Sequence, residues 1–540
     1  MALARVACRA QVGLTAPPVQ VEAHLGAGLP CFTLVGLAGT EVKESKERVR
    51  AALVNSGFEF PAGRITVNLA PADLPKDGGR FDLAVAVAIL LASGQLRPQR
   101  DLADHEFLGE LGLDGAIRVV RGALPAAAAT ARAGRSLILP RGNAPDLRWL
   151  PGARALTATS LLTLCAELEG RPAPDDDPAP EAGRDPGHDP GRDMGRDMGR
   201  DMGRDADPET AAAPLRLADV CGQTLGKRAL EVAAAGGHSL LFVGPPGCGK
   251  SMLAQRLPAL LPPLEPQEAL DVALIASIAG VVPDARRRLT AARLPRPFRA
   301  PHHTASASAI IGGGSDARPG EITLAHRGVL FLDELPEFDR RVLEALREPL
   351  ETGQVSVSRA GQRADYPAAF QLIAAMNPCP CGRHGTAAVP GGAPACRCPV
   401  SLVERYRARL SGPLLDRIDL RVALGAVGEA ELAEHRRRPP CDDAPLRARI
   451  AAARERQWQR QGCLNAALPA AGLEERLGVS AGAQRMLASG RGPLALSLRA
   501  RHRCLRVARS LADLGGSEVL EEPHLAEALA LRRALGADRD

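Results

Sequence analysis

The sequence is poor in aromatic residues and in lysine, and it has no long apolar run. Phe, Trp and Tyr account for 3% of the 540 residues, so few side chains are available to stack on nucleic-acid bases. The chain has 5 lysines and 63 arginines. Any one arginine is therefore weak evidence of a functional role, and a lysine is stronger evidence. Without an apolar run of about 18 residues we expect no membrane span, and the first residues lack the apolar core of a signal peptide. These absences favour a cytoplasmic protein.

Charge is distributed unevenly along the chain, whose net charge is +6. Residues 1–170 carry +2, residues 171–214 carry −6 and residues 215–540 carry +10. A basic segment of this size is expected of a protein that binds a polyanion such as DNA, although a solvated arginine-rich surface would look the same. Any DNA contact should run mainly through phosphates and be nearly independent of base sequence.

Composition divides the chain into four segments. Residues 171–214 are rich in Pro, Gly and Asp and repeat R-D-M-G three times, which is typical of a disordered linker. Residues 1–170 mix strand and helix patterns and predict an α/β domain. After the linker we expect an α/β ATPase core at 215–425 and a helical lid at 426–540. The elements predicted in the first domain are a strand at 65–71, a buried helix at 81–94 and a strand at 136–140.

An apolar strand runs into a glycine-rich loop at residues 240–251, LLFVGPPGCGKS. The motif G-x-x-x-x-G-K-S in this setting is typical of a phosphate-binding loop, whose backbone N–H groups surround phosphate oxygens. We expect Lys250 to contact the β- and γ-phosphates of ATP and Ser251 to bind Mg²⁺. The predicted cofactor-binding residues of the loop are Gly244, Pro245, Pro246, Gly247, Cys248, Gly249, Lys250 and Ser251.

Two further strand ends complete the predicted nucleotide site. Residues 329–334, VLFLDE, form a predicted buried strand that ends in two adjacent carboxylates. Two charged groups at the end of a buried strand cost folding free energy, so their presence indicates a functional site. We expect Asp333 to hold Mg²⁺ and Glu334 to act as general base toward the attacking water. Asn377 follows the next apolar strand, QLIAAM, and is suited to orienting that water.

Two arginines follow these motifs in the order that AAA+ motors use. Arg417 lies in GPLLDRIDL, and Arg499 lies in SLRARHR at the start of a predicted lid helix. We predict that Arg417 reaches the γ-phosphate bound by a neighbouring subunit and that Arg499 senses it from the lid. The first role implies a ring, as a homo-hexamer. In a chain with so many arginines, a surface role is the alternative for both.

Two segments are candidates for gripping nucleic acid. Residues 296–322 form a basic, histidine-containing and glycine-rich insertion, and residues 353–363 predict a β-hairpin. Either is expected to face a central pore, and either could instead be a structural connection.

Four of the 12 cysteines cluster after the third apolar strand, as C-x-C at Cys379 and Cys381 and again at Cys396 and Cys398. Four thiolates are enough to hold a structural Zn²⁺ in a tetrahedral site, and His384 could replace one of them. Free thiols or a redox pair are the alternative. The other cysteines are expected to be reduced core residues.

Beyond the individual motifs, nearly the whole chain outside 171–214 resembles the ComM/YifB family, the magnesium-chelatase-like AAA+ ATPases of bacteria. The stretches that carry the resemblance include FRAPHHTAS (298–306), GEITLAHRGVLFLDELPEF (320–338), AAMNPCPCG (374–382) and RLSGPLLDRIDL (409–420). The resemblance implies a hexameric DNA helicase that drives branch migration during homologous recombination, notably in natural transformation. Its expected partner is DNA, whether branched, single-stranded or double-stranded. Recombination proteins are then possible partners.

The first domain is similar to a Lon protease domain that has lost its catalytic pair. Where that domain has a nucleophilic serine, PKDGGRFD (75–82) has Arg80, and the activating lysine corresponds to Pro125. Peptide hydrolysis then has no nucleophile and no base. Two alternative functions stay open at this point, a magnesium-chelatase-type motor subunit for metal insertion and an ATP-dependent protease or remodelling factor.

Overall fold

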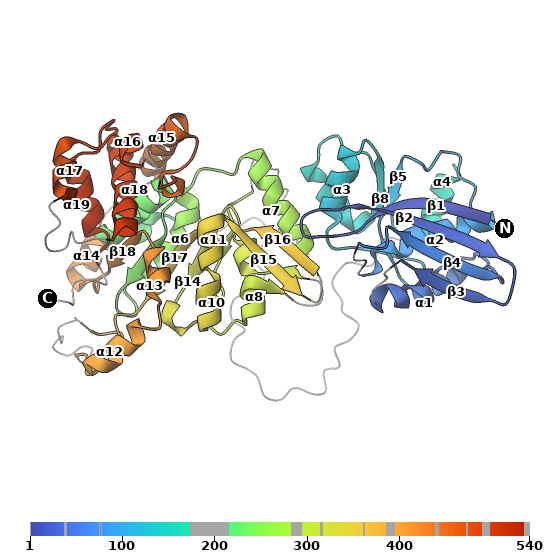
Figure 1. Cartoon of the computed structure of the whole chain (residues 1–540), viewed down its shortest axis with the longest axis horizontal. Coiled ribbons are helices and arrows are strands. Elements are labelled where there is room, and N and C mark those ends of the chain that lie inside the picture. Colours follow the sequence, from blue (N-terminus) through green and yellow to red (C-terminus); the bar gives the residue numbers. More distant parts are fainter. Residues whose placement is uncertain are drawn as a thin grey trace. The chain divides into compact units, whose positions relative to one another are not determined.

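The chain has two compact units in the computed structural model (Figure 1). The first contains the described residues up to 172 together with 276–281, and the second contains residues 215–275 and those from 294 onward. The predicted linker 171–214 lies outside the described residues after position 172. The structure describes residues 2–36, 40–74, 76, 78–172, 215–281, 294–313, 317–359, 362–384, 395–437, 442–470, 473–488 and 497–533.

The first unit is built on a seven-stranded mixed sheet with the strand order β3-β4-β2-β1-β5-β8-β9. The pairs β1–β2 and β2–β4 are antiparallel, and the other four pairs are parallel. The predicted strands at 65–71 and 136–140 are confirmed as β4 and β8. The strands are β1 (Ala2–Arg9), β2 (Pro18–Gly26), β3 (Cys31–Val35), β4 (Arg64–Ala70), β5 (His105–Phe107), β8 (Ser136–Pro140) and β9 (Ala155–Ala158).

A buried helix, α2 (Asp82–Ser93), packs on β1 and β2 and confirms the helix predicted at 81–94. It is apolar around most of its circumference, so it fits only in the interior of a layered domain. It ends at Gly94, whose φ of 76° lets its N–H reach the carbonyls of Leu90 and Leu91. The unit's other elements are α1 (Thr40–Asn55), α3 (Ala123–Arg132), α4 (Leu161–Leu168), β6 (Glu110–Leu111), β7 (Ile117–Arg118) and 3-10 helices at Gly79–Phe81 and Arg141–Trp149.

The second unit contains a five-stranded parallel sheet with the order β11-β14-β17-β10-β18. Its inner strands are almost continuous runs of buried apolar residues, as expected where helices cover both faces. Because all five strands run the same way, their carboxyl ends meet at one edge, where ligands bind in such sheets. The strands are β10 (Leu240–Val243), β11 (Phe298–Arg299), β14 (Val329–Leu332), β17 (Gln371–Met376) and β18 (Leu420–Ala423).

The helices predicted as a lid share one hydrophobic core with this sheet. Leu240 of the sheet and Leu505 of α18 belong to the same buried cluster, and α5 packs against both α15 and α18. The lid is therefore anchored to the ATPase core by buried apolar surface. The larger helices are α5 (Thr224–Gly236), α6 (Lys250–Leu260), α7 (Pro266–Ala279), α12 (Val400–Arg407), α14 (Glu429–Arg437), α15 (Ala444–Gln461), α17 (Ala481–Ala488), α18 (Leu498–Gly515) and α19 (Glu522–Ala530).

Short elements fill the segment between α7 and β17. The predicted hairpin is confirmed as β15 (Gln354–Arg359) paired antiparallel with β16 (Gln362–Pro367). The insertion at 296–322 contains α8 (Ala307–Ile311) and the small sheet β12 (Gly312–Gly313) with β13 (Arg318–Pro319). The second unit also contains several short helices in other places. They are α9 (Glu321–Leu324), α10 (Arg340–Ala345), α11 (Arg347–Thr352), α13 (Gly412–Asp416), α16 (Leu473–Leu477) and 3-10 helices at Leu217–Asp219, Leu335–Glu337 and Asn465–Ala467. Among the described residues, every helix is too short or too polar to cross a bilayer.

Candidate nucleotide-binding site

The predicted phosphate loop joins β10 to α6 in a conformation that calls for glycine at two positions. Gly247 and Gly249 have φ angles of 75° and 95°, in the region that glycine enters without strain. A Cβ at either position would meet no atom within 4 Å, so the space over the loop is open. Gly249 is the N-cap of α6, whose first N–H groups have no partner within the helix. Open space at such a helix start suits a phosphate group.

Lys250 is buried against the loop that precedes it. Its Nζ donates to the carbonyl oxygens of Gly244 at 2.8 Å and Pro245 at 2.9 Å, and to Oδ1 of Asn377 at 3.1 Å. Burial lowers the pKa of this ammonium group. All three hydrogen-bond partners are neutral, so the positive charge has no bonded counter-charge and would gain from a phosphate.

Ser251 and Asp333 lie together although they are far apart in the sequence. The Ser251 hydroxyl donates to Oδ2 of Asp333 at 2.7 Å, and Oδ1 of Asp333 accepts the Glu334 N–H at 2.9 Å. Hydroxyl and carboxylate oxygens are the ligands that Mg²⁺ prefers, so the residues present fit this cation. When bound, Mg²⁺ would offset charge on the transferred phosphoryl group.

A cavity of about 330 Å³ opens over these groups. Its volume lies at the small end of the usual range for ligand pockets. Three predicted loop residues do not line it. The carbonyls of Gly244 and Pro245 accept hydrogen bonds from Lys250, and the Cys248 side chain is buried. The lining residues are Pro246, Gly247, Gly249, Lys250, Ser251, Met252, Asp333, Glu334, Met376 and Asn377. All except the two methionines are predicted from the sequence motifs.

The cavity brings together the parts that phosphoanhydride hydrolysis needs. Glu334 is half exposed at its mouth, where a carboxylate can accept a proton from water. Oδ1 of Asn377 is used by Lys250, which leaves the amide NH₂ as a donor to a water or a phosphate. The arrangement can therefore bind a polyphosphate with a divalent cation and present a general base.

Arg417 lies outside this cavity and is buried within its own chain. Its side chain is 9% exposed, and it donates to the carbonyl of Pro413 at 2.7 Å and to the carboxylate of Glu351. Glu351 itself is 55% exposed. A role at a neighbouring subunit's phosphate therefore requires Arg417 to exchange Glu351 for that phosphate, and the role stays a prediction.

Arg499 also lies outside the cavity, exposed in the first turn of α18. One turn further on, Arg503 donates to the carbonyl of Arg417 at 2.9 Å and to Oδ1 of Asp419 at 2.6 Å. The helix that bears Arg499 is thus bonded to the segment that bears Arg417. Sequence reasoning missed this link, because an Arg–Asp contact across so many residues leaves no local pattern.

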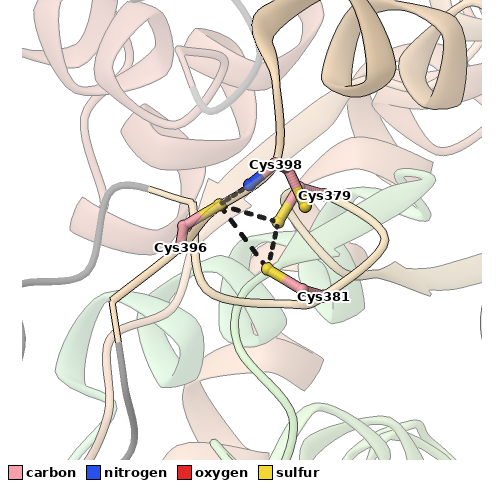
Figure 2. Close-up of side chains that lie close together, drawn as sticks. All are labelled: Cys379, Cys381, Cys396 and Cys398. Carbon is pink, nitrogen blue, oxygen red and sulfur yellow. Dashed lines mark hydrogen bonds between the residues drawn. The ribbon is translucent and has the colours of Figure 1, made fainter.

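The four clustered cysteines converge in space, as Figure 2 shows. Their sulfur atoms all lie within 4.8 Å of one another, and the Sγ–Sγ distances from Cys379 to Cys381 and Cys396 are 3.3 and 3.7 Å. A disulfide needs about 2.05 Å, whereas four thiolates about 2.3 Å from one Zn²⁺ lie about 3.8 Å apart. The donor set therefore fits zinc. His384 contributes only its backbone N–H, which donates to Cys379 Sγ at 3.3 Å.

The turn that carries the cysteines packs on the phosphate loop. Gly382 has a φ of 77°, and a Cβ there would lie 2.5 Å from Cδ of Pro246. The hydrogen bond from the Arg383 backbone and the Cys379 thiol lower the pKa of Cys381 to about 6.

In the first unit, the position that corresponds to the Lon serine is filled by buried Arg80. Its guanidinium donates to the Arg121 carbonyl at 2.6 Å and to Oε1 of Gln11 at 3.4 Å. Pro125, at the position of the lysine, is buried in α3. A guanidinium has no lone pair for attack on a peptide carbonyl, so this pair of positions offers no hydrolytic chemistry.

His303 is a neighbour of the site that sequence reasoning missed. Its Nδ1 lies 3.1 Å from Oε2 of Glu334. The sequence predicts a nucleic-acid contact or a structural connection for the insertion that contains it, although the H-H doublet lies only a few residues after the end of β11.

Magnesium-chelatase families match three parts of the chain. "Magnesium chelatase, subunit ChlI" matches residues 216–432, "Subunit ChlI of Mg-chelatase" matches 21–143 and "Magnesium chelatase, subunit ChlI C-terminal" matches 442–532. The chain is 45% identical over 532 residues to the uncharacterized protein YifB of Salmonella typhimurium, covering 98% of this chain and 97% of that protein. It is 43% identical over 533 residues to the competence protein ComM of Haemophilus influenzae, covering 98% of each. The chain belongs to the ComM/YifB family.

Family membership confirms the predicted fold class and makes this chain a magnesium-chelatase-like AAA+ protein, of a kind that hydrolyses ATP with Mg²⁺. A further 139-residue match, 33% identical, connects 24% of this ComM/YifB member with 17% of the Lon protease of Roseiflexus castenholzii. That match fits the Lon-like interpretation of the first domain.

Proposed function

We propose that this chain is an ATP-driven DNA motor that promotes branch migration in homologous recombination, including the integration of incoming DNA in natural transformation. Six copies form a ring in this proposal. Arg417 of one copy completes the nucleotide site of the next, and Arg499 reports on the bound phosphate from the lid.

The observation that carries the proposal is the cavity in which Lys250, Ser251, Asp333, Glu334 and Asn377 meet. These side chains supply phosphate binding, cation binding and a general base in one place. The net charge of +10 on residues 215–540 favours a polyanion as the object that is moved. The relative named as a competence protein, similar over nearly its whole length, favours DNA over other polyanions.

The test is the steady-state ATPase rate without DNA, with single-stranded DNA, with duplex and with a four-way junction. Glu334→Gln serves as the blank for contaminating ATPases. Strongest stimulation by the junction, weakening as salt rises, supports the proposal. Equal rates with all four samples would refute a DNA motor.

A metal-insertion motor is the second candidate, because the family descriptions name magnesium chelatase. The first unit does not separate the two functions, since one of those descriptions covers residues 21–143. Equal ATPase rates with and without DNA would favour this candidate. Arg80 and Pro125, which stand where a Lon protease has its serine and lysine, argue against proteolysis. Cleavage of casein that requires both ATP and the first unit would instead support an ATP-dependent protease.

We also propose that Cys379, Cys381, Cys396 and Cys398 hold a structural Zn²⁺ and that cytoplasmic conditions keep them reduced. Purified protein should contain about one zinc per chain, released by a thiol-modifying reagent and measured with a colorimetric chelator. The double variant Cys379→Ser/Cys396→Ser should lose it, and Cys31→Ser, at an exposed site in the other unit, should retain it. Metal-free wild-type protein would favour free thiols.

A further inference from the structure

The cysteine cluster joins two segments of the chain that both contact the nucleotide site. Cys379 and Cys381 follow β17, and Cys396 and Cys398 precede α12. The four sulfur atoms lie within 4.8 Å of one another (Figure 2), although residues 382–395 separate the two pairs in the sequence. A metal ion held by all four would therefore close a loop and remove conformational freedom from both of its ends.

The first end of this loop carries Asn377 and a turn that packs on the phosphate loop. Oδ1 of Asn377 accepts from Nζ of Lys250 at 3.1 Å. The turn is closed by the Gly382 N–H, which donates to the Cys379 carbonyl at 2.9 Å. A Cβ on Gly382 would lie 2.5 Å from Cδ of Pro246, a residue that lines the nucleotide cavity. The position of this turn therefore limits where the phosphate loop can lie.

The second end returns to the same residues through α12. Tyr406 of this helix is buried and hydrogen-bonded to the backbone of Asn377. The next residue, Arg407, donates from Nε to the Pro378 carbonyl at 3.4 Å. A shift of α12 relative to β17 would therefore move the Asn377 amide away from Lys250.

At the cysteines themselves, contacts within the protein hold the two ends together only weakly. Thiols are weak hydrogen-bond donors and weak acceptors. Of the four, Cys379 is buried, whereas Cys381 is exposed and Cys396 and Cys398 are partly exposed, so apolar burial also contributes little there. Coordination of one metal ion by four thiolates is far stronger than these contacts. The metal is therefore the main source of order at this point of the chain.

We infer that zinc bound at the four cysteines positions Asn377 and the phosphate loop, so that zinc and ATP strengthen each other's binding. A loop that is already ordered binds a phosphate at a smaller cost in conformational entropy. Coupling of two binding sites is reciprocal, so the factor by which zinc raises the affinity for ATP is also the factor by which ATP raises the affinity for zinc. Gly382 transmits the effect as a positioning residue. The inference rests on the zinc site and the ATP site of the proposed function.

The first measurement is the affinity for zinc, obtained by competition with a colorimetric chelator in the presence and absence of ATP and Mg²⁺. It uses Glu334→Gln, which is expected to bind ATP without hydrolysing it. ATP should raise the zinc affinity about 5-fold or more, the lower end of typical coupling between two sites. Adding Lys250→Ala to this variant should abolish the effect, and it also corrects for zinc bound by free ATP. Zinc-depleted protein should bind a fluorescent ATP analogue more weakly by a similar factor.

The second measurement tests the contact between the turn and the phosphate loop. In Gly382→Ala the added Cβ would press on Pro246 while all four cysteines stay in place. This variant should keep about one zinc per chain, bind ATP about 5-fold or more weakly, and lose the effect of ATP on zinc affinity. The matched control is Gly462→Ala, because Gly462 has a similar φ of 70° but no atom within 4 Å of the added Cβ. The control introduces the same backbone strain and should bind ATP and zinc as the wild type does.

The outcomes separate the coupling from the proposals on which it rests. A protein that neither contains nor takes up zinc would overturn the zinc site and the coupling together. An equal zinc affinity with and without ATP would overturn the coupling and leave the zinc site standing. Equal ATP affinities of folded Gly382→Ala and Gly462→Ala would overturn Gly382 as the point of transmission. None of these samples contains DNA, so the DNA-motor proposal is tested independently.

Discussion

At the scale of single residues, the site depends on one ammonium group and one carboxylate. The ammonium group of Lys250 is hydrogen-bonded only to neutral oxygens, an arrangement that favours an incoming phosphate. Glu334 lines the cavity, is half exposed, and has one carboxylate oxygen 3.1 Å from Nδ1 of His303. Binding and hydrolysis thus depend on different side chains and can be separated by substitution.

Replacing Lys250 by alanine should weaken ATP binding about 10- to 100-fold. A hydrogen bond to a charged group contributes about 1.5–3 kcal/mol, and each 1.4 kcal/mol is a factor of about ten. Titration with a fluorescent ATP analogue measures the effect. Lys46→Ala, in α1 of the first unit, is the matched control and should bind as the wild type does. If both variants bind ATP with equal affinity, Lys250 does not contribute to ATP binding.

Replacing Glu334 by glutamine should leave ATP binding intact and lower kcat by about 10²- to 10⁴-fold, the usual contribution of a general base. The amide keeps the shape of the side chain and loses the proton acceptor. Single-turnover hydrolysis of radiolabelled ATP gives the rate of the chemical step. A variant that still turns over at more than a tenth of the wild-type rate would require another base.

Most of the site residues could be predicted because each lies within a contiguous motif. Gly247 and Lys250 belong to the loop after β10, and Asp333 and Asn377 directly follow β14 and β17. The parallel order of these strands brings their ends together. The contact of His303 with Glu334 could not be predicted in the same way, because it depends on the direction of one side chain in an insertion without a known pattern.

At the scale of elements, the junction between α18 and β18 is polar and buried. Asp419, just before β18, accepts from Arg503 at 2.6 Å and contacts the His238 ring at 3.2 Å. Burial alone would raise the pKa of Asp419, but His238 and Arg503 outweigh it and hold that pKa well below the usual value. Its stabilising contribution is therefore present above the ordinary carboxyl range and is lost as the pH falls through the depressed pKa.

Replacing Asp419 by alanine should destabilise this junction by about 3–5 kcal/mol, because it leaves buried partners unpaired. The control is Glu474→Ala, which removes a partly exposed pair with Arg501 at 2.8 Å that is expected to contribute less than about 1 kcal/mol. Hydrogen exchange of the amides in β18 and α18 measures both. Equal protection in the two variants would contradict the structural role of Asp419.

Periodicity predicted most elements closely, since α2, β4, β8, β17 and the hairpin fall where apolar residues and turns place them. It could not show that the lid shares a core with the sheet. Leu240 and Leu505 belong to separate local patterns, and their burial together is decided only by tertiary packing.

At the scale of the whole molecule, the proposed ring places Arg417 of one subunit at the nucleotide site of the next subunit. Arg417→Ala should bind ATP and hydrolyse it slowly, and mixing it with Glu334→Gln should restore part of the activity. Restoration is expected because some interfaces then join an intact Glu334 to an intact Arg417. ATPase rates across mixing ratios provide the measurement. A strictly additive loss at every ratio would place the action of Arg417 within its own chain, where it contacts Glu351.

The pairing of β10 also determines when during synthesis the nucleotide site can form. Leu240 is paired with Ile373 on one side and with Leu420 on the other, and the Arg421 N–H is bonded to the Leu531 carbonyl. The strand that leads into the phosphate loop therefore leaves the ribosome long before its neighbours exist. Until then it is an apolar segment with two open edges, which is a risk of aggregation. A nascent chain can gain stability from ATP only after β17 and β18 have also been synthesised.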